Sequence, residues 1–330
     1  MKKRSDIERI EREILGEFAT KASSSKGREI YEEEDDIRTC FQRDRDRIIH
    51  SKAFRRLMHK TQVFLSPEGD HYRTRLTHTL EVSQIARTIA RGLGLNEDLT
   101  EAIALRHDLG HTPFGHNGEM VLDEIHPSGF RHNVQSLRVV DVLETGMFGR
   151  GINLTFEVRD GILNHTGSGT PSTPEGMIVK TSDRIAYINH DIDDALRSGV
   201  LKEEDLPSDC LNYLGKTHRE RISRLVTNMI ENSDGKKEVS LDKEATMYMN
   251  KLRKFMFASV YYNEEVKKAE DLENVENAIR FLYNYFLNSF KKLPEEYRLM
   301  KDSFSKEELV KDYVAGMTDR YALNLYNELK

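Results

Sequence analysis

The chain has 330 residues, of which 32% are charged and only seven are proline, and its formal net charge at pH 7 is −6. The length allows one large domain or two smaller ones, the composition favours a mostly helical protein with a charged surface, and the net charge argues against a globally basic nucleic-acid binder. No apolar run approaches the roughly 20 residues that span a bilayer, the first residues do not form a signal-peptide core, and two cysteines are too few for a disulfide framework. We therefore expect a cytoplasmic protein.

Residues 1–37 are predicted to form an N-terminal arm that is partly mobile. Within this arm, residues 21–36 combine serine, lysine and glycine with five consecutive acidic residues, a composition that is typical of loops. We expect the folded body to occupy residues 38–330.

A locally basic stretch follows, from Arg43 to Arg75, in which nine lysines and arginines face four acidic residues, a surplus of five. Such a stretch suits a polyphosphate ligand, because guanidinium and ammonium groups bind phosphate oxygens. The alternative is a solvated helix face on which the arginines and aspartates of residues 43–47 pair with one another.

Apolar residues recur at helical spacing along the rest of the chain, and we see no clear alternating strand and no internal repeat. Gly110 and Pro113 predict a turn that carries His111 and His116, and residues 167–174 predict a loop. The predicted fold class is therefore all-α. We expect helices over 76–93, from the N-cap Asn96 to His107 and Asp108, over 133–144, 155–163 and 178–199, and further helices toward the C-terminus with a break at 232–235.

Three helix-associated positions in this sequence carry residue types that bind metals. His78 lies in the first turn of one predicted helix, His107 and Asp108 end a second, and Asp183 lies in a third. Two imidazoles and two carboxylates suit a divalent ion such as manganese, magnesium, iron, cobalt, nickel or zinc, and they leave positions open for water and substrate. A single His-Asp pair would be weak evidence, since such pairs also occur on surfaces and at helix caps, but its recurrence at helix ends favours a metal site.

Two further groups suit catalysis or substrate binding. Asp183, Tyr187 and Asp191 stand at i, i+4 and i+8 and therefore share one face of a helix; alternatively, Tyr187 is a half-buried core residue. His116 and Glu119 are one turn apart, so the carboxylate can orient the imidazole for proton transfer, or Glu119 only complements a helix dipole. His111 and His132 are further candidates for binding phosphate.

These residues lie in motifs that resemble those of the HD-domain deoxynucleoside triphosphate triphosphohydrolases, the dGTPase-like family. The resemblance covers most of the chain from about residue 38 to the end. The matching segments are Arg43 to Ser51, Ala53 to Leu57, Lys60 to Phe64, Arg75 to His78, His107 to His116, Asp183 to Tyr187 and Gly316 to Arg320.

The resemblance implies an HD-domain helical bundle, with residues 200–330 as a C-terminal helical extension, that hydrolyses a dNTP to a deoxynucleoside and inorganic triphosphate. It implies that His78, His107, Asp108 and Asp183 are the metal ligands and that His116 and Glu119 form the acid–base pair. His111 and His132 are implied to contact phosphate. The implied substrate-binding residues are Arg55, Gln62, Val63, Arg75, Arg184, Tyr187 and Asp191.

Two other functions stay open from the sequence. A different HD-domain enzyme acting on nucleoside monophosphates or cyclic nucleotides would share the His and His-Asp ligands, and a regulatory protein could bind single-stranded nucleic acid through residues 43–60. The resemblance also suggests a homo-oligomer and a possible activating nucleotide. We expect no membrane partner.

Overall fold

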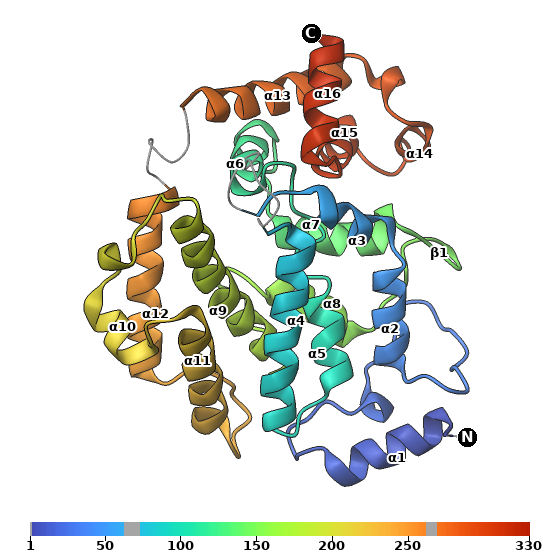
Figure 1. Ribbon diagram of the computed structural model, residues 1–330. Helices are drawn as coiled ribbons and strands as arrows, with labels where there is room; N and C mark the ends of the chain where they lie inside the picture. Colours follow the sequence, from blue (N-terminus) through green and yellow to red (C-terminus); the bar gives the residue numbers. More distant parts are fainter. Residues whose placement is uncertain (1, 63–72, 262–268) are drawn as a thin grey trace. The chain divides into compact units, whose positions relative to one another are not determined.

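The computed structural model describes residues 2–62, 73–261 and 269–330, and the described residues form sixteen α-helices and one two-stranded hairpin (Figure 1). The predicted all-α class is confirmed. The chain divides into two compact units that interleave along the sequence: unit 1 contains residues 1–50, 78–107 and 153–266, and unit 2 contains residues 51–77, 108–152 and 267–330. Residues 200–330, which we expected as one extension, are therefore divided between the units.

Unit 1 is built around α5, which packs against α2, α8 and α9 (Figure 1). Apolar side chains of these helices, among them Leu99, Ile103, Ile162 and Ile185, are fully buried. The helices of unit 1 are α1 (Arg4–Ile14), α2 (Cys40–Ile49), α4 (Arg75–Gly92), whose first turn belongs to unit 2, α5 (Glu97–Ala104), α8 (Phe156–Asn164), α9 (Pro174–Arg197), α10 (Ser208–Leu214), α11 (His218–Ser233) and α12 (Lys243–Met256), with 3-10 turns at Ala22–Ser24 and Glu203–Asp205 and a π-helical turn at Phe257–Tyr261.

The helix limits follow local signals in the sequence. Asn96 caps α5 by accepting from the Leu99 amide, and Thr173 caps α9 by accepting from the Gly176 amide, with Pro174 as the first helical residue. However, α5 ends at Ala104, so the prediction that His107 and Asp108 lie within this helix is wrong. They lie in the turn that follows it.

The segment expected as an N-terminal arm contains α1 and is bonded to unit 1 at several points. The Thr20 amide and hydroxyl donate to Glu175 of α9, and the Ser25 hydroxyl donates to Glu157 of α8. The Arg28 guanidinium forms an ion pair with Asp44, whose side chain is fully buried in α2. These contacts tie residues 20–28 to the helices beneath them.

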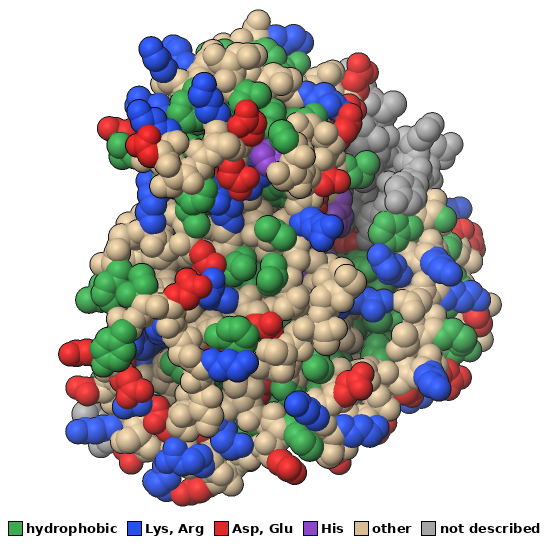
Figure 2. All heavy atoms as spheres, turned by 180° about the vertical axis from the view of Figure 1, so that it is seen from behind, with side chains coloured by type: hydrophobic (Ala, Val, Ile, Leu, Met, Phe, Trp, Pro, Cys, Tyr) green, Lys and Arg blue, Asp and Glu red, His purple; other side chains and the backbone are tan. Residues whose placement is uncertain are grey.

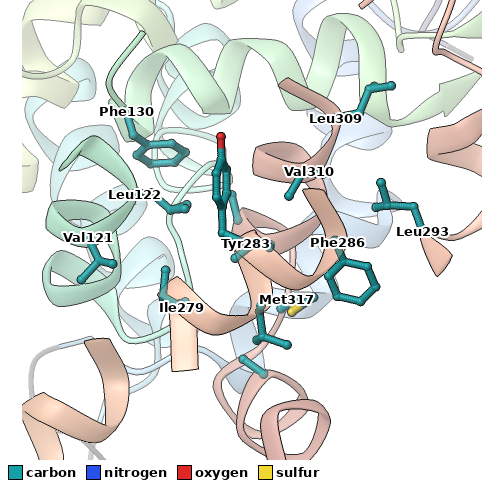
Figure 3. Close-up of a cluster of buried hydrophobic side chains, with 14 of the residues drawn as sticks. Val121, Leu122, Phe130, Ile279, Tyr283, Phe286, Leu293, Leu309, Val310 and Met317 are labelled. Carbon is teal, nitrogen blue, oxygen red and sulfur yellow. The ribbon is translucent and has the colours of Figure 1, made fainter. Parts of the chain in front are cut away.

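Unit 2 has its own apolar core, in which α13 packs against α6, α15 and α16. Figure 3 shows this cluster, with Leu122 of α6, Tyr283 of α13 and Val310 of α15 facing one another. The elements of unit 2 are α3 (Lys52–Arg56), α6 (Gly115–Ile125), α7 (His132–Arg138), β1 (Thr145–Gly146), β2 (Gly149–Arg150), α13 (Ala269–Asn288), α14 (Glu295–Arg298), α15 (Lys306–Ala315) and α16 (Asp319–Leu329), with 3-10 turns at Leu57–His59 and Phe290–Lys292 and a π-helical turn at Val139–Leu143.

Two details of unit 2 differ from the sequence prediction. The antiparallel hairpin of β1 and β2 was not predicted, because two-residue strands show no alternating pattern. His116 lies in the first turn of α6 and not in the preceding loop. Among the described residues, no helix is both long enough and apolar enough to cross a membrane.

Candidate active site

Three predicted metal ligands meet in unit 1. His78 comes from α4, His107 from the turn after α5, and Asp183 from α9. The His78 Nε2 atom lies 3.1 Å from Asp183 Oδ1, and the His107 Nε2 atom lies 3.6 Å from the same oxygen. Both imidazoles are buried, so three segments that are distant in sequence present ligand atoms to one point.

The spacing of these atoms fits a divalent ion. Ligand atoms about 2.1 Å from an ion would be about 3.0 Å apart at a right angle and about 3.4 Å apart at a tetrahedral angle, and the two observed distances of 3.1 and 3.6 Å agree with this. The donor set of two imidazoles and one carboxylate suits several first-row metals, and its identity is not fixed by the donors.

Neighbouring groups hold these side chains in the form that binds a metal. The His107 Nδ1 atom lies 2.7 Å from the Ala104 carbonyl oxygen, so Nε2 is the ring atom of His107 that would bind an ion. Burial opposes ionisation of Asp183, but its interactions with His107 and His78 outweigh burial and hold its pKa well below the ordinary value. Asp183 is therefore a carboxylate at neutral pH.

The rest of the predicted α9 face is also in unit 1. Tyr187 is half-buried, and burial raises the pKa of its phenol, so the hydroxyl is neutral and able to donate a hydrogen bond. Asp191 is buried. The Arg184 guanidinium donates to Asn250 Oδ1 of α12 at 2.6 Å, which fixes one end of this side chain.

Sequence reasoning missed two histidines, each of which lies beside one of the histidine ligands. His190 of α9 lies with its Nδ1 atom 3.2 Å from Glu81 Oε2 of α4, and its ring meets the His78 ring edge-on at 5.9 Å. His165 likewise meets the His107 ring at 5.3 Å. His190 stands seven residues after Asp183, two turns along the same face of α9, so helical spacing could have pointed to it, whereas His165 has no such relation to the ligands.

Unit 2 contains the second set of predicted site residues. The Arg75 guanidinium donates from Nη1 to Asp108 Oδ2 at 2.9 Å, and the other oxygen of Asp108 lies 3.1 Å from His111 Nε2. Arg75 is almost fully buried, yet its Nε and Nη2 atoms have no hydrogen-bond partner among the described residues. A buried guanidinium with unused donors suits a phosphate oxygen.

Glu119 lies beside three histidines of this unit. Its carboxylate oxygens lie 2.9 and 3.0 Å from His132 Nδ1, 3.6 Å from His116 Nδ1 and 3.8 Å from His111 Nδ1. The His111 and His132 rings stack at 4.0 Å. His116 is the exposed member, with 71% of its side chain accessible, so it is the one that can reach a bound molecule from solvent.

The electrostatics of this histidine group are set by burial and by charge. Burial, together with the neighbouring Arg75 and His132, lowers the pKa of His111, so this imidazole is neutral at pH 7. Burial opposes ionisation of Glu119, but its bonds to His116 and His132 hold its pKa far below the ordinary value. One ligand-type atom each from Asp108, His111 and His132 lies within 4.8 Å of the others, and the nearby Arg75 favours an anion there over a second cation.

The remaining predicted substrate-binding residues are placed as follows. Gln62 is described, and its Oε1 atom is buried without a partner among the described residues, whereas Val63 lies outside the described residues. Arg55 lies exposed in α3.

The arginines at the start of the basic stretch form ion pairs with acidic residues. Arg43 and Arg47 form ion pairs with Glu32, and Arg45 pairs with Asp98 of α5 at 3.0 Å. Lys60 is buried and donates to the carbonyl oxygens of His111 and Ala315. Arg43, Arg45 and Arg47 therefore pair mainly with acids of other segments, and the binding of a polyphosphate by these side chains stays a prediction. On the face drawn in Figure 2, basic and acidic side chains are likewise interspersed.

Comparison with known proteins agrees with this arrangement. The HD domain family matches residues 75–188, and the phosphohydrolase-associated domain family matches residues 239–328. A deoxyguanosinetriphosphate triphosphohydrolase-like protein of Caldanaerobacter subterraneus subsp. tengcongensis is 58% identical over 100% of this chain and 96% of its own, and one of Clostridium tetani is 48% identical over the same shares. A solved phosphohydrolase from Bacteroides thetaiotaomicron superposes with a TM-score of 0.52 at 17% identity, covering 83% of this chain and 66% of that one, and it supports the fold alone.

The fold, the His and Asp group and the two domain matches define an HD-domain phosphohydrolase with a place for a divalent metal. Within that class, the chain belongs to the deoxyguanosinetriphosphate triphosphohydrolase-like family. The resemblance predicted from the motifs is thereby confirmed.

Proposed function

We propose that this protein hydrolyses deoxynucleoside triphosphates, dGTP and other dNTPs among them, to a deoxynucleoside and inorganic triphosphate by attack of water at the α-phosphate. The observation that carries the proposal is the convergence of His78, His107 and Asp183 at ligand spacing in a chain whose relatives are named deoxyguanosinetriphosphate triphosphohydrolase-like. Asp108, the residue after His107 in the chain, is the fourth proposed ligand.

A divalent ion held by these residues would polarise the α-phosphate and lower the pKa of a water molecule. The protein's own side chains supply the rest. Arg75, whose buried Nε and Nη2 atoms have no partner among the residues that the structure describes, would bind a phosphate oxygen. His116, exposed and oriented by Glu119, would give a proton to the departing 5′-oxygen. The P–OH bond forms as the P–O5′ bond breaks. The deoxynucleoside departs, and the three phosphates stay joined as inorganic triphosphate.

Sugar recognition is assigned to one helix face and one loop residue. Tyr187 and Asp191 share the α9 face with Asp183, and the side-chain oxygen of Gln62 is buried without a partner in the described part of the chain. We propose that these three contact the deoxyribose and that close packing against C2′ excludes a ribose hydroxyl. The oligomer, the activating nucleotide and the nucleic-acid partner stay predictions.

The test is product analysis with Mn²⁺ and each of the four dNTPs, with ribonucleotides and dGMP in parallel. We expect deoxynucleoside and triphosphate from dNTPs; release of orthophosphate or pyrophosphate, or turnover of dGMP alone, would contradict the proposal. Asp183→Ala should lose both bound metal and turnover. Asp36→Ala, which removes an exposed acid of unit 1, is the matched control and should behave as wild type.

A further inference from the structure

The carboxylate of Asp319 joins two segments of unit 2 that are distant in sequence. Its Oδ2 atom accepts from the Thr61 amide at 2.8 Å and from the Thr61 hydroxyl at 2.7 Å. Its Oδ1 atom accepts from the Phe114 amide at 2.9 Å. Asp319 is the first residue of α16, so a helix terminus of the C-terminal region holds two loops from the N-terminal half of the chain.

Both loops lead directly into predicted site residues. Gln62 follows Thr61, and His116 stands two residues after Phe114. The loops also approach each other closely: a Cβ atom added at Gly115 would lie 3.2 Å from the Gln62 carbonyl oxygen and 2.9 Å from Arg75 Nη2. A small displacement of either loop would therefore move Gln62, Arg75 and His116 relative to one another.

The backbone before His116 needs such support, because it is strained. Phe114 has φ of 62° and Gly115 has φ of 58°, and the left-handed region is unfavourable for a residue with a large side chain. The Phe114 ring is buried in the core cluster of unit 2, to which Met317 also belongs. Burial of the ring holds one side of this turn, and the bond from the Phe114 amide to Asp319 holds its backbone.

We propose that Asp319 is a positioning residue that fixes the Gln62 loop and the turn before His116 in one arrangement, and that this is a task of the C-terminal region in this enzyme. Asp319 acts through Thr61 and Phe114 and does not touch the substrate. The expected effect on catalysis rests on the proposed function. The attachment of the two loops to Asp319 can be measured without turnover.

The experiment compares Asp319→Asn with wild type and with Asp302→Asn, an exposed acid of unit 2 that serves as the matched control. We expect Asp319→Asn to lower kcat/KM for dGTP by about 10- to 100-fold, since a displacement of about 1 Å has an effect of this size. Metal content should equal that of wild type, because His78, His107 and Asp183 bond elsewhere. In hydrogen exchange, peptides covering residues 57–62 and 112–118 should exchange at least several-fold faster, and peptides from α9 should not change.

A second pair of variants distinguishes loss of the Thr61–Asp319 hydrogen bond from a general loss of folding. Thr61→Ser keeps the hydroxyl donor and should retain activity, whereas Thr61→Val loses it and should lower kcat/KM in the same direction as Asp319→Asn. Unchanged activity and exchange in Asp319→Asn would overturn the proposal, and so would a global rise in exchange with parallel loss of metal. If wild type does not hydrolyse dNTPs, the proposed function fails, and the exchange at 57–62 and 112–118 still decides whether Asp319 holds the two loops.

Discussion

Glu119 is the residue on which the histidine group of unit 2 depends most. It bonds the Nδ1 atom of His132 through both oxygens and also accepts from the His132 backbone amide at 2.9 Å. Glu119→Gln leaves one acceptor oxygen for these donors and His116. We expect kcat/KM to fall about 10- to 100-fold, the usual cost of losing a side chain that orients a catalytic histidine, with bound metal unchanged, as measured by steady-state kinetics and metal analysis.

The control for this prediction lies in the same helix. Glu124 is exposed and forms an ion pair with Arg280, so Glu124→Gln should keep wild-type activity. Full activity in Glu119→Gln would remove this residue from the catalytic group and leave His116 without its proposed orienting partner.

Residue types at the site could be predicted from the sequence, but their pairings could not. Metal chemistry restricts ligands to a few side chains, so His78, His107 and Asp183 could be selected, and they meet in unit 1. The spacing of three residues pointed to a His116–Glu119 pair, whereas Glu119 lies closer to His132, thirteen residues away. Asp319 was visible only as part of a motif, because its partners Thr61 and Phe114 are set by tertiary contacts.

Among the secondary-structure elements, helices with strong periodicity and clear caps could be predicted well. The limits of α4, α8 and α9 lie within a few residues of those expected, since Gly92, Thr155 and Gly199 mark their ends. The hairpin of β1 and β2 and the early end of α5 could not be predicted, because their signals are only one or two residues long.

The contact between α5 and α8 depends on the absence of a side chain at Gly161. A Cβ atom there would lie 2.6 to 2.8 Å from three carbon atoms of Ile103, which is fully buried. Gly161→Ala should therefore lower the free energy of unfolding by about 1 to 3 kcal/mol, the usual cost of overpacking a core, as measured by urea denaturation. Gly16→Ala, whose Cβ would meet its neighbours at 3.6 Å, should have a smaller effect; equal effects would contradict the argument from packing.

The link between α15 and the end of α6 predicts a pH dependence. The bond to His126 lowers the pKa of Glu308 to about 2, with Lys311 adding to it, although burial opposes the shift. Because the folded-state pKa lies below the ordinary value of 4.5, the stability contributed by Glu308 is present above pH 4.5 and is lost as the pH falls toward 2. Glu308→Gln should be about 1 to 3 kcal/mol less stable than wild type at pH 7, and this difference should shrink in denaturation experiments from pH 4.5 downward.

The comparison must isolate Glu308 from other groups that titrate in acid. Glu295→Gln changes an exposed residue of α14 and should show no difference from wild type at either end of the pH range. A Glu308→Gln difference that stayed constant from pH 7 to the acid limit would show that the lost stability does not come from ionisation of Glu308.

For the whole molecule, metal binding should stabilise the folded state, because the ligands of unit 1 come from segments that are distant in sequence. The three ligands come from α4, the turn after α5, and α9, so their convergence requires these three elements to be folded together. An ion bound only by the folded chain at 100 times its dissociation constant adds about 2.7 kcal/mol to the stability. We expect the melting temperature of wild type to rise by roughly 5 °C with saturating Mn²⁺ and to fall again with EDTA. Asp183→Ala should melt at the same temperature with and without Mn²⁺, whereas Asp36→Ala should respond as wild type does; an equal rise in Asp183→Ala would place the stabilising ion elsewhere in the protein.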